Sequence, residues 1–89
     1  MTSRTTKEFW NYFDLLPKGI RNQAVKAYKA WNTNPNHPSL YFKPIHSTEP
    51  IYSVRISRGY RALGLKEDNT ITWFWIGSHQ EYEKLISRF

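Results

Sequence analysis

The sequence predicts an α+β domain in which an N-terminal helical hairpin packs on a small antiparallel β-sheet. The chain has 89 residues, which suits a single domain over residues 1–89, because two domains would each be too small to hold a core. Apolar residues recur at helical spacing as far as Trp31, whereas apolar and polar residues alternate beyond Pro50. A run of helices followed by a run of strands is typical of the α+β class.

Two helices are predicted before Asn32. Residues 5–8 have the spacing of a capping box, and the helix that follows them ends before Pro17. Its apolar positions are Phe9, Tyr12, Phe13 and Leu16. After a break at residues 17–19, a second helix presents an apolar face made of Ile20, Ala24, Ala27, Tyr28 and Trp31. Because a tight turn joins them, the two helices are expected to present one shared apolar face.

The rest of the chain predicts a loop, a set of strands and a short C-terminal helix. Residues 32–39 contain two prolines and three asparagines, which is typical of a loop. A short strand is expected at residues 40–43. Three longer strands joined by tight turns are then expected at residues 51–57, 60–66 and 70–76. Residues 80–89 are expected to form a terminal helical turn.

The alternation within these strands predicts which side chains share a sheet face. Arg55 stands between Val54 and Ile56, so Arg55 points away from the face that the apolar residues occupy. One face of the sheet is therefore expected to take the helices, and the face that holds Arg55 is expected to stay partly open. Trp73 and Trp75 are two residues apart and are expected to share a face, as core or partner-contacting residues.

Charge clustering indicates an anionic partner. The formal net charge is +6, and a basic domain attracts polyanions, of which nucleic acid is the commonest. Residues 17–41 carry four basic side chains and no acid: Lys18, Arg21, Lys26 and Lys29. Residues 50–65 carry three and no acid: Arg55, Arg58 and Arg61. Net charge that serves only solubility is the plainer alternative.

Composition excludes several classes of protein and of site. The mean hydropathy of −0.70 and the lack of an apolar run of about 20 residues argue against a membrane protein. No cysteine is present, so disulfides, zinc–thiolate sites and thiol nucleophiles are excluded. No secretory signal is visible, and a cytoplasmic location is expected. The three histidines are scattered among loops, so neither a metal nor a cofactor is expected, which leaves metal-free acid–base chemistry by Arg, His and Tyr.

Two stretches carry a resemblance to a known family. Residues 52–61 read Tyr-Ser-Val-Arg-Ile-Ser-Arg-Gly-Tyr-Arg, and residues 71–82 read Ile-Thr-Trp-Phe-Trp-Ile-Gly-Ser-His-Gln-Glu-Tyr. Together with the helical hairpin they resemble the RelE-like toxins of the RelE/ParE superfamily, which belong to type II toxin–antitoxin systems. The resemblance implies an acidic antitoxin as partner. It also implies a metal-independent endoribonuclease that cleaves mRNA in the ribosomal A site, where the RNA 2′-hydroxyl attacks the neighbouring phosphate.

The resemblance also implies roles for individual residues. Arg55 matches a basic strand residue that acts as base or charge stabiliser, and Arg61 matches the arginine that contacts the scissile phosphate. His79 stands where some members have an arginine assigned to protonation of the leaving group, and Tyr82 matches a tyrosine that stacks on or orients the substrate. Ser53 stands where some members have a lysine, so their general base is missing here. Histidine changes charge near neutral pH, so His79 is expected to take an acid or base role.

RNA-binding residues are also expected outside the catalytic set, and other roles and functions stay open. The residues expected to bind RNA outside the catalytic set are Arg58, Tyr60, Lys43, Lys26 and Lys29. In the structural alternatives, His79 is a surface or capping residue, Arg61 pairs with Glu67 or Glu81, and Arg55 is a solvated sheet residue. Two other functions share the fold: a ParE-like toxin that poisons DNA gyrase, and a non-catalytic nucleic-acid-binding module. The fold cannot separate these functions, because function depends on the site.

Overall fold

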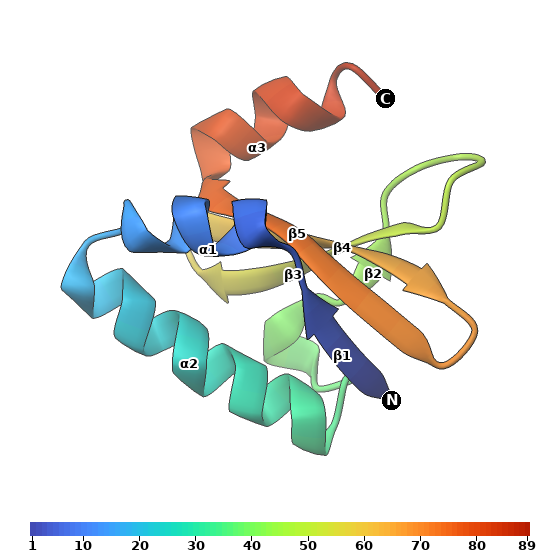
Figure 1. Ribbon diagram of the computed structural model, residues 1–89, viewed down its shortest axis with the longest axis horizontal. Coiled ribbons are helices and arrows are strands. Elements are labelled where there is room, and N and C mark those ends of the chain that lie inside the picture. The colour runs from blue at the N-terminus through green and yellow to red at the C-terminus, as the bar shows by residue number, and fades with distance from the viewer.

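A computed structural model describes all residues, 1–89, as a five-stranded sheet with helices on both faces (Figure 1). The elements in chain order are β1 (Thr2–Thr5), α1 (Lys7–Asp14), α2 (Lys18–Thr33), a 3₁₀ turn (Pro38–Leu40), β2 (Lys43–Pro44), β3 (Ile51–Ser57), β4 (Tyr60–Glu67), β5 (Thr70–Ser78) and α3 (His79–Ile86). The strand order is β1-β5-β4-β3-β2, and all neighbours are antiparallel except β1 and β5. The predicted α+β class, with N-terminal helices packed on a mostly antiparallel sheet, is confirmed. None of the helices combines the length and apolar character that crossing a membrane requires.

Strand β1 was not expected, and it changes how the first helix begins. It pairs in parallel with β5 from Thr2 opposite Thr70 to Thr5 opposite Trp73. Its four residues are polar and too few to show an alternation. Only their pairing with the distant strand β5 identifies them as a strand. Because Thr5 belongs to this strand, the capping box expected at residues 5–8 is wrong. Thr6 caps α1 instead, and its hydroxyl accepts a hydrogen bond from the backbone N–H of Phe9.

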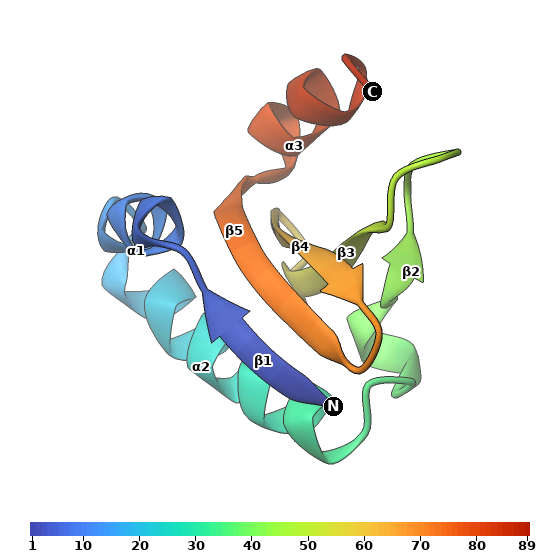
Figure 2. The ribbon, with the colours of Figure 1, turned by 45° about the vertical axis from the view of Figure 1, so that its right-hand side comes forward.

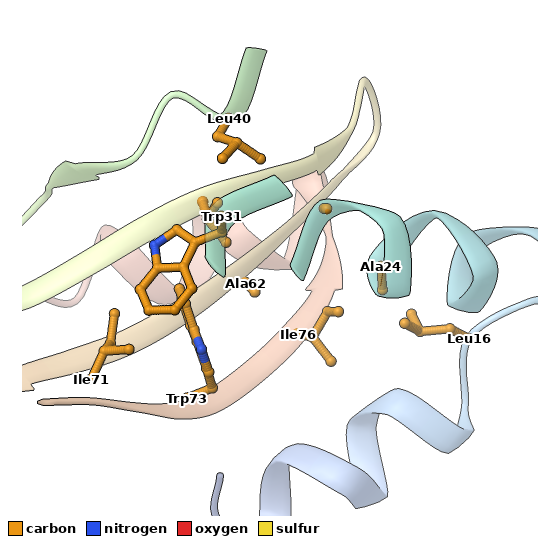
Figure 3. Packing of buried hydrophobic residues seen from close by; sticks show 10 residues of the cluster. Leu16, Ala24, Trp31, Leu40, Ala62, Ile71, Trp73 and Ile76 are labelled. Carbon is orange, nitrogen blue, oxygen red and sulfur yellow. The ribbon is translucent and has the colours of Figure 1, made fainter. Parts of the chain in front are cut away.

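The two N-terminal helices pack on the same sheet face, as expected. Helix α1 lies against β5 and helix α2 against β3. The rings of Trp31 from α2 and Trp73 from β5 meet edge to face with 5.4 Å between their centroids, at the centre of the core (Figure 3). Tyr28 does not belong to the buried face, because it remains 44% exposed and its hydroxyl lies 2.7 Å from Ser3 Oγ. The buried positions of α2 are Ala24, Ala27 and Trp31.

The expectation that Trp73 and Trp75 share a face is wrong, because β5 contains a bulge. Leu63 of β4 pairs with Trp75, but its neighbour Gly64 pairs with Trp73, so β5 contains one extra residue between the two pairs. Trp73 therefore faces the N-terminal helices, whereas Trp75 packs with Leu63 on the other side. Gly64 allows close packing beside the bulge, because a Cβ atom there would lie 2.7 Å from Ile71 Cγ1.

The second sheet face is covered in part by α3. A terminal helical turn was expected at residues 80–89, and the helix covers His79–Ile86. The hydroxyl of Ser78 caps it by accepting from the backbone N–H of Glu81. It lies beyond the end of β5 and away from α2 (Figures 1 and 2). Tyr82 of α3 joins Leu63 and Trp75 in a second, smaller core. The strand expected at residues 40–43 is a 3₁₀ turn followed by the two-residue β2, which leaves the region between β2 and α3 open.

Candidate functional site

A hollow on the α3 side of the sheet gathers the four predicted catalytic side chains. Its volume is about 550 Å³. Strands β2, β3 and β4 contribute to its walls on one side and α3 contributes on the other. The residues that line it are Tyr41, Lys43, Pro44, Ile45, Ser53, Arg55, Arg61, His79, Tyr82, Glu83 and Ile86. The sequence expectations thus converge on one place in the fold.

The electrostatic feature of the hollow is a pair of arginines directly opposite each other. Arg55 of β3 pairs with Arg61 of β4 in the strand register, so both side chains point to the same face. Like charges placed in this way repel each other. Neither guanidinium forms an ion pair with a carboxylate; the two ion pairs of the chain lie within α3. An anion bound between the two arginines would relieve this repulsion.

Arg61 is held by backbone carbonyls rather than by an acid. Its Nη1 donates to the carbonyl oxygen of Ser57 at 2.7 Å and to that of Tyr60 at 2.9 Å. The structural alternative in which Arg61 pairs with Glu67 or Glu81 is therefore wrong. Partial burial lowers the pKa of Arg61 from its usual value, and the charge of Arg55 lowers this pKa further. The Nε and Nη2 groups keep no protein partner, so they are free for a bidentate contact with a phosphate.

His79 is the first residue of α3; one hydrogen bond anchors its backbone and two contacts orient its ring. Its backbone N–H donates to the carbonyl of Gly59 at 2.7 Å, which ties the start of α3 to the β3–β4 turn beside Arg61. Its Nε2 lies 3.1 Å from Glu83 Oε1, one helical turn on. The ring stacks on Tyr82 with 5.7 Å between centroids. Its Nδ1 is buried and has no hydrogen-bond partner.

Tyr82 is part of the second core, which limits its contact with a substrate. It is 6% exposed, and its hydroxyl donates to Ser53 Oγ at 3.3 Å in the floor of the hollow. Ser53 is itself buried. Because its ring lies against His79, Tyr82 is better placed to position the imidazole than to stack on a nucleobase.

Comparisons with known proteins agree with this geometry. A family model described as a ParE-like toxin domain matches residues 18–84 of the chain. The chain belongs to the ParE-like toxin domain family. Its arrangement of helices and sheet is the RelE/ParE fold of type II toxin–antitoxin toxins. None of the curated protein sequences is significantly similar to it.

Solved structures of low sequence identity share the fold of this toxin domain. A chain of the RelB–RelE antitoxin–toxin complex from Methanococcus jannaschii superposes with a TM-score of 0.75 at 18% identity, over 92% of this chain and 96% of that one. The toxin–antitoxin complex RelBE2 from Mycobacterium tuberculosis gives a TM-score of 0.70 at 22% identity, over 88% and 96%. The isolated E. coli RelE toxin gives 0.65 at 15% identity, over 98% and 96%.

The predicted RNA-binding residues of the toxin domain lie in three different places. Lys43 lines the hollow, and Arg58 is exposed in the adjacent β3–β4 turn. Tyr60 packs against the core on the N-terminal helix side, so it does not share a face with Arg61. Lys26 and Lys29 are exposed on α2, which covers the opposite sheet face. Only Lys43 and Arg58 therefore remain candidates for contacts close to the hollow.

The prediction from the sequence did not include two residues that line the site of this toxin domain. Glu83 is the only acidic side chain that lines the hollow, and its spacing of four residues from His79 on a helix is a signal that could have found it. Tyr41 stands at the rim with a left-handed backbone, φ 46° and ψ 42°. No pattern in the sequence indicates that conformation, because tyrosine rarely adopts it.

The hydrogen bond between Tyr82 and Ser53 is expected to stabilise the toxin domain. Tyr82→Phe keeps the ring but leaves the buried Ser53 hydroxyl without its partner, which typically costs about 1 kcal/mol. For a domain of this size that loss lowers the Tm by about 4–8 °C. Thermal unfolding followed by circular dichroism measures the change. Ser53→Ala in the Tyr82→Phe background should recover much of it, and an unchanged Tm in the single variant would show that the bond contributes nothing.

Proposed function

We propose that this toxin domain is a ribosome-dependent endoribonuclease that cleaves mRNA by metal-free acid–base and electrostatic catalysis. The observation that supports this proposal is the convergence of Arg55, Arg61 and His79 on one hollow, where both arginines lack a carboxylate partner. Paired cations beside a group that exchanges protons near neutral pH suit a phosphodiester that gathers negative charge as it reacts. A toxin that poisons gyrase through protein contacts has no need of this set.

The proposed reaction is a transesterification within the RNA. The 2′-hydroxyl gives up its proton to a solvent water and its oxygen attacks the adjacent phosphorus. The bond from phosphorus to the 5′-oxygen breaks, and the products are a 2′,3′-cyclic phosphate and a 5′-hydroxyl end. His79 in its protonated form donates a proton from Nε2 to the departing 5′-oxygen, which replaces Glu83 as the partner of this nitrogen, because Nδ1 is buried. The free edge of Arg61 binds the phosphate oxygens and offsets their growing charge, and Arg55 adds a second positive charge from the neighbouring strand.

The hollow contains no strong general base for the 2′-hydroxyl, and the proposed dependence on the ribosome follows from this. Ser53 stands where some RelE-like toxins have a lysine, and here it is buried under the Tyr82 hydroxyl. Apart from His79, no lining residue ordinarily changes its charge close to neutral pH. Holding the 2′-hydroxyl in line with the phosphate must then supply much of the rate, and such positioning is worth several kcal/mol, up to about 7–11 in favourable cases.

An acidic antitoxin is the proposed protein partner. Two of the structurally similar chains come from complexes named as toxin with antitoxin. The net charge of +6 favours association with an acidic protein. An apolar groove of about 380 Å³ runs between α1, α2 and β1, and the exposed Trp10, Val25 and Tyr28 line it. Exposed apolar surface of this kind marks protein-binding sites.

The test compares one mRNA in two states. Purified toxin domain is added to ribosomes programmed with a defined mRNA and, separately, to the same mRNA free in solution, and the 5′ ends are mapped by primer extension. Cleavage within the A-site codon, far faster on ribosomes than in solution, is expected. The acidic product of a neighbouring open reading frame should suppress this cleavage when it is added in equal amount.

Other outcomes of the same experiment assign the function differently. Equal rates on free and ribosome-bound mRNA would indicate an ordinary ribonuclease. No cleavage in either state, together with inhibition of gyrase supercoiling by the same preparation, would replace the proposal with the gyrase-poisoning alternative.

A further inference from the structure

Tyr41 combines an exposed aromatic ring with a backbone conformation that is unfavourable for its residue type. Its φ of 46° lies in the left-handed region, which is uncommon for bulky residues. The ring is 59% exposed, and its hydroxyl makes no hydrogen bond within the protein. Residues held in such conformations cluster at functional sites, because the surrounding structure must keep them there.

The two neighbours of Tyr41 explain how this conformation is maintained. Leu40 is 3% exposed in the core on the N-terminal helix side, and Phe42 packs on the same core, with its ring 5.8 Å from Trp31 and 4.9 Å from Tyr52 between centroids. A regular strand would also place Leu40 and Phe42 on one face, but here Leu40 ends the 3₁₀ turn and Tyr41 follows it as a left-handed cap. The chain therefore bends at Tyr41 while the side chains on both sides of it stay in the core. The left-handed residue between them turns its own ring outward, to the rim of the hollow.

The ring also has a defined partner on the sheet. The guanidinium carbon of Arg55 lies over it, 5.5 Å from the ring centroid, in the range of a cation–π contact. Arg55 is at the same time the strand neighbour of Arg61. One side chain thus links the exposed ring to the pair of positive charges that would hold a phosphate.

We infer that Tyr41 is a stacking platform for a nucleobase of the RNA whose phosphate binds between Arg55 and Arg61. The inference deepens the proposed function and rests on it. Single-stranded RNA is recognised through unstacked bases that lie on aromatic rings, and arginine planes extend such platforms. A base on Tyr41 and a phosphate at the arginines bind adjoining parts of one strand, so stacking would hold the codon in register with the site.

The test uses ribosomes programmed with mRNA in which 2-aminopurine replaces each base of the A-site codon in turn. A 2′-O-methyl group at the cleavage position prevents the reaction. The fluorescence of 2-aminopurine falls when it stacks, so binding of the toxin domain should quench one of the three positions. Tyr41→Gly should abolish this quenching and weaken binding by about 5- to 150-fold, whereas Tyr41→Trp should retain it.

The choice of variants keeps folding separate from binding. Glycine accepts a positive φ, so Tyr41→Gly should unfold at the same temperature as the wild type or a higher one. Tyr12→Ala is the matched control, since Tyr12 is also an exposed tyrosine but lies on α1, outside both the hollow and the apolar groove; this variant should quench and bind like the wild type. An abasic nucleotide at the quenched position should bind the wild type and Tyr41→Gly equally.

Each remaining outcome counts against a stated part of the inference. If the wild type cleaves mRNA on ribosomes but Tyr41→Gly quenches and binds as the wild type does, the stacking role is wrong and the proposed function stands. If the wild type neither binds programmed ribosomes nor cleaves their mRNA, the proposed function and the stacking role fail together.

Discussion

Replacing Arg61 by lysine is expected to lower the rate of mRNA cleavage by about 10²–10³-fold, the usual effect of losing a charge-stabilising donor in a reaction of this kind. Arg61 Nη1 is already bound to the carbonyls of Ser57 and Tyr60, and its Nε and Nη2 have no protein partner beside the hollow that Arg61 lines. A lysine can offer one point charge but not an anchored edge together with a free bidentate edge. Single-turnover cleavage on programmed ribosomes, with toxin in excess, measures the change.

The Arg61 experiment has a matched control and a specific signature in pH. Arg21→Lys makes the same exchange on α2, away from the hollow, and should leave the rate unchanged. Burial and Arg55 lower the pKa of Arg61, but the pKa of an arginine starts far above neutrality. Arg61 therefore stays protonated at every pH between about 5.5 and 8.5. The Arg61→Lys rate should therefore be lower by the same factor at every pH. A loss of less than about tenfold would remove Arg61 from the assigned role.

Removing the imidazole at His79 is expected to lower the cleavage rate by about 10²–10⁴-fold, the contribution of a well-placed general acid. The dependence of the rate on pH should also change. Where His79 donates its proton to the leaving group, its loss by deprotonation slows the wild type as the pH rises, and His79→Ala should show a flatter profile. Single-turnover rates at several pH values between about 5.5 and 8.5 bracket the region in which histidines titrate.

His46 supplies the control for His79, because its ring lies in the β2–β3 loop and accepts from the backbone N–H groups of Thr48 and Glu49. His46→Ala should cleave with the profile of the wild type. Glu83→Gln should fall between His79→Ala and the wild type, since it weakens the contact that orients the imidazole and leaves the ring in place. A His79→Ala variant that matches the wild type at every pH would transfer the acid role to another group, and Arg55 would be tested next.

The sequence predicted those parts of the fold that local patterns determine. The apolar spacing of Ala24, Ala27 and Trp31 located the buried face of α2, and the alternation around Arg55 assigned the faces of β3 correctly. The parts that it missed depend on distant partners. Strand β1 exists because β5 pairs with it, and the faces of Trp73 and Trp75 depend on a bulge that only the pairing with β4 defines. A single-residue shift of this kind reverses every side chain beyond it.

The candidate site was predicted only in part, again because some of its features depend on contacts between residues that are distant in the sequence. The resemblance named Arg55, Arg61, His79 and Tyr82, and all four line one hollow. Tyr60 lies apart from them, because it packs on the N-terminal helix side of the sheet. Tyr41 could not be found, since its role depends on a left-handed backbone that two core side chains impose.

The pairing of β1 with β5 also fixes when the domain can be completed during its own synthesis. Strand β1 is translated before β5 and must wait for it, since Thr2 pairs with Thr70, and contacts between such distant residues slow folding. His79 and Glu83 follow still later, in the C-terminal helix. A nascent or prematurely terminated chain that ends before His79 has both arginines but lacks His79 itself and the helix that covers the second core. Residues that are translated after β5 therefore complete the proposed catalytic hollow.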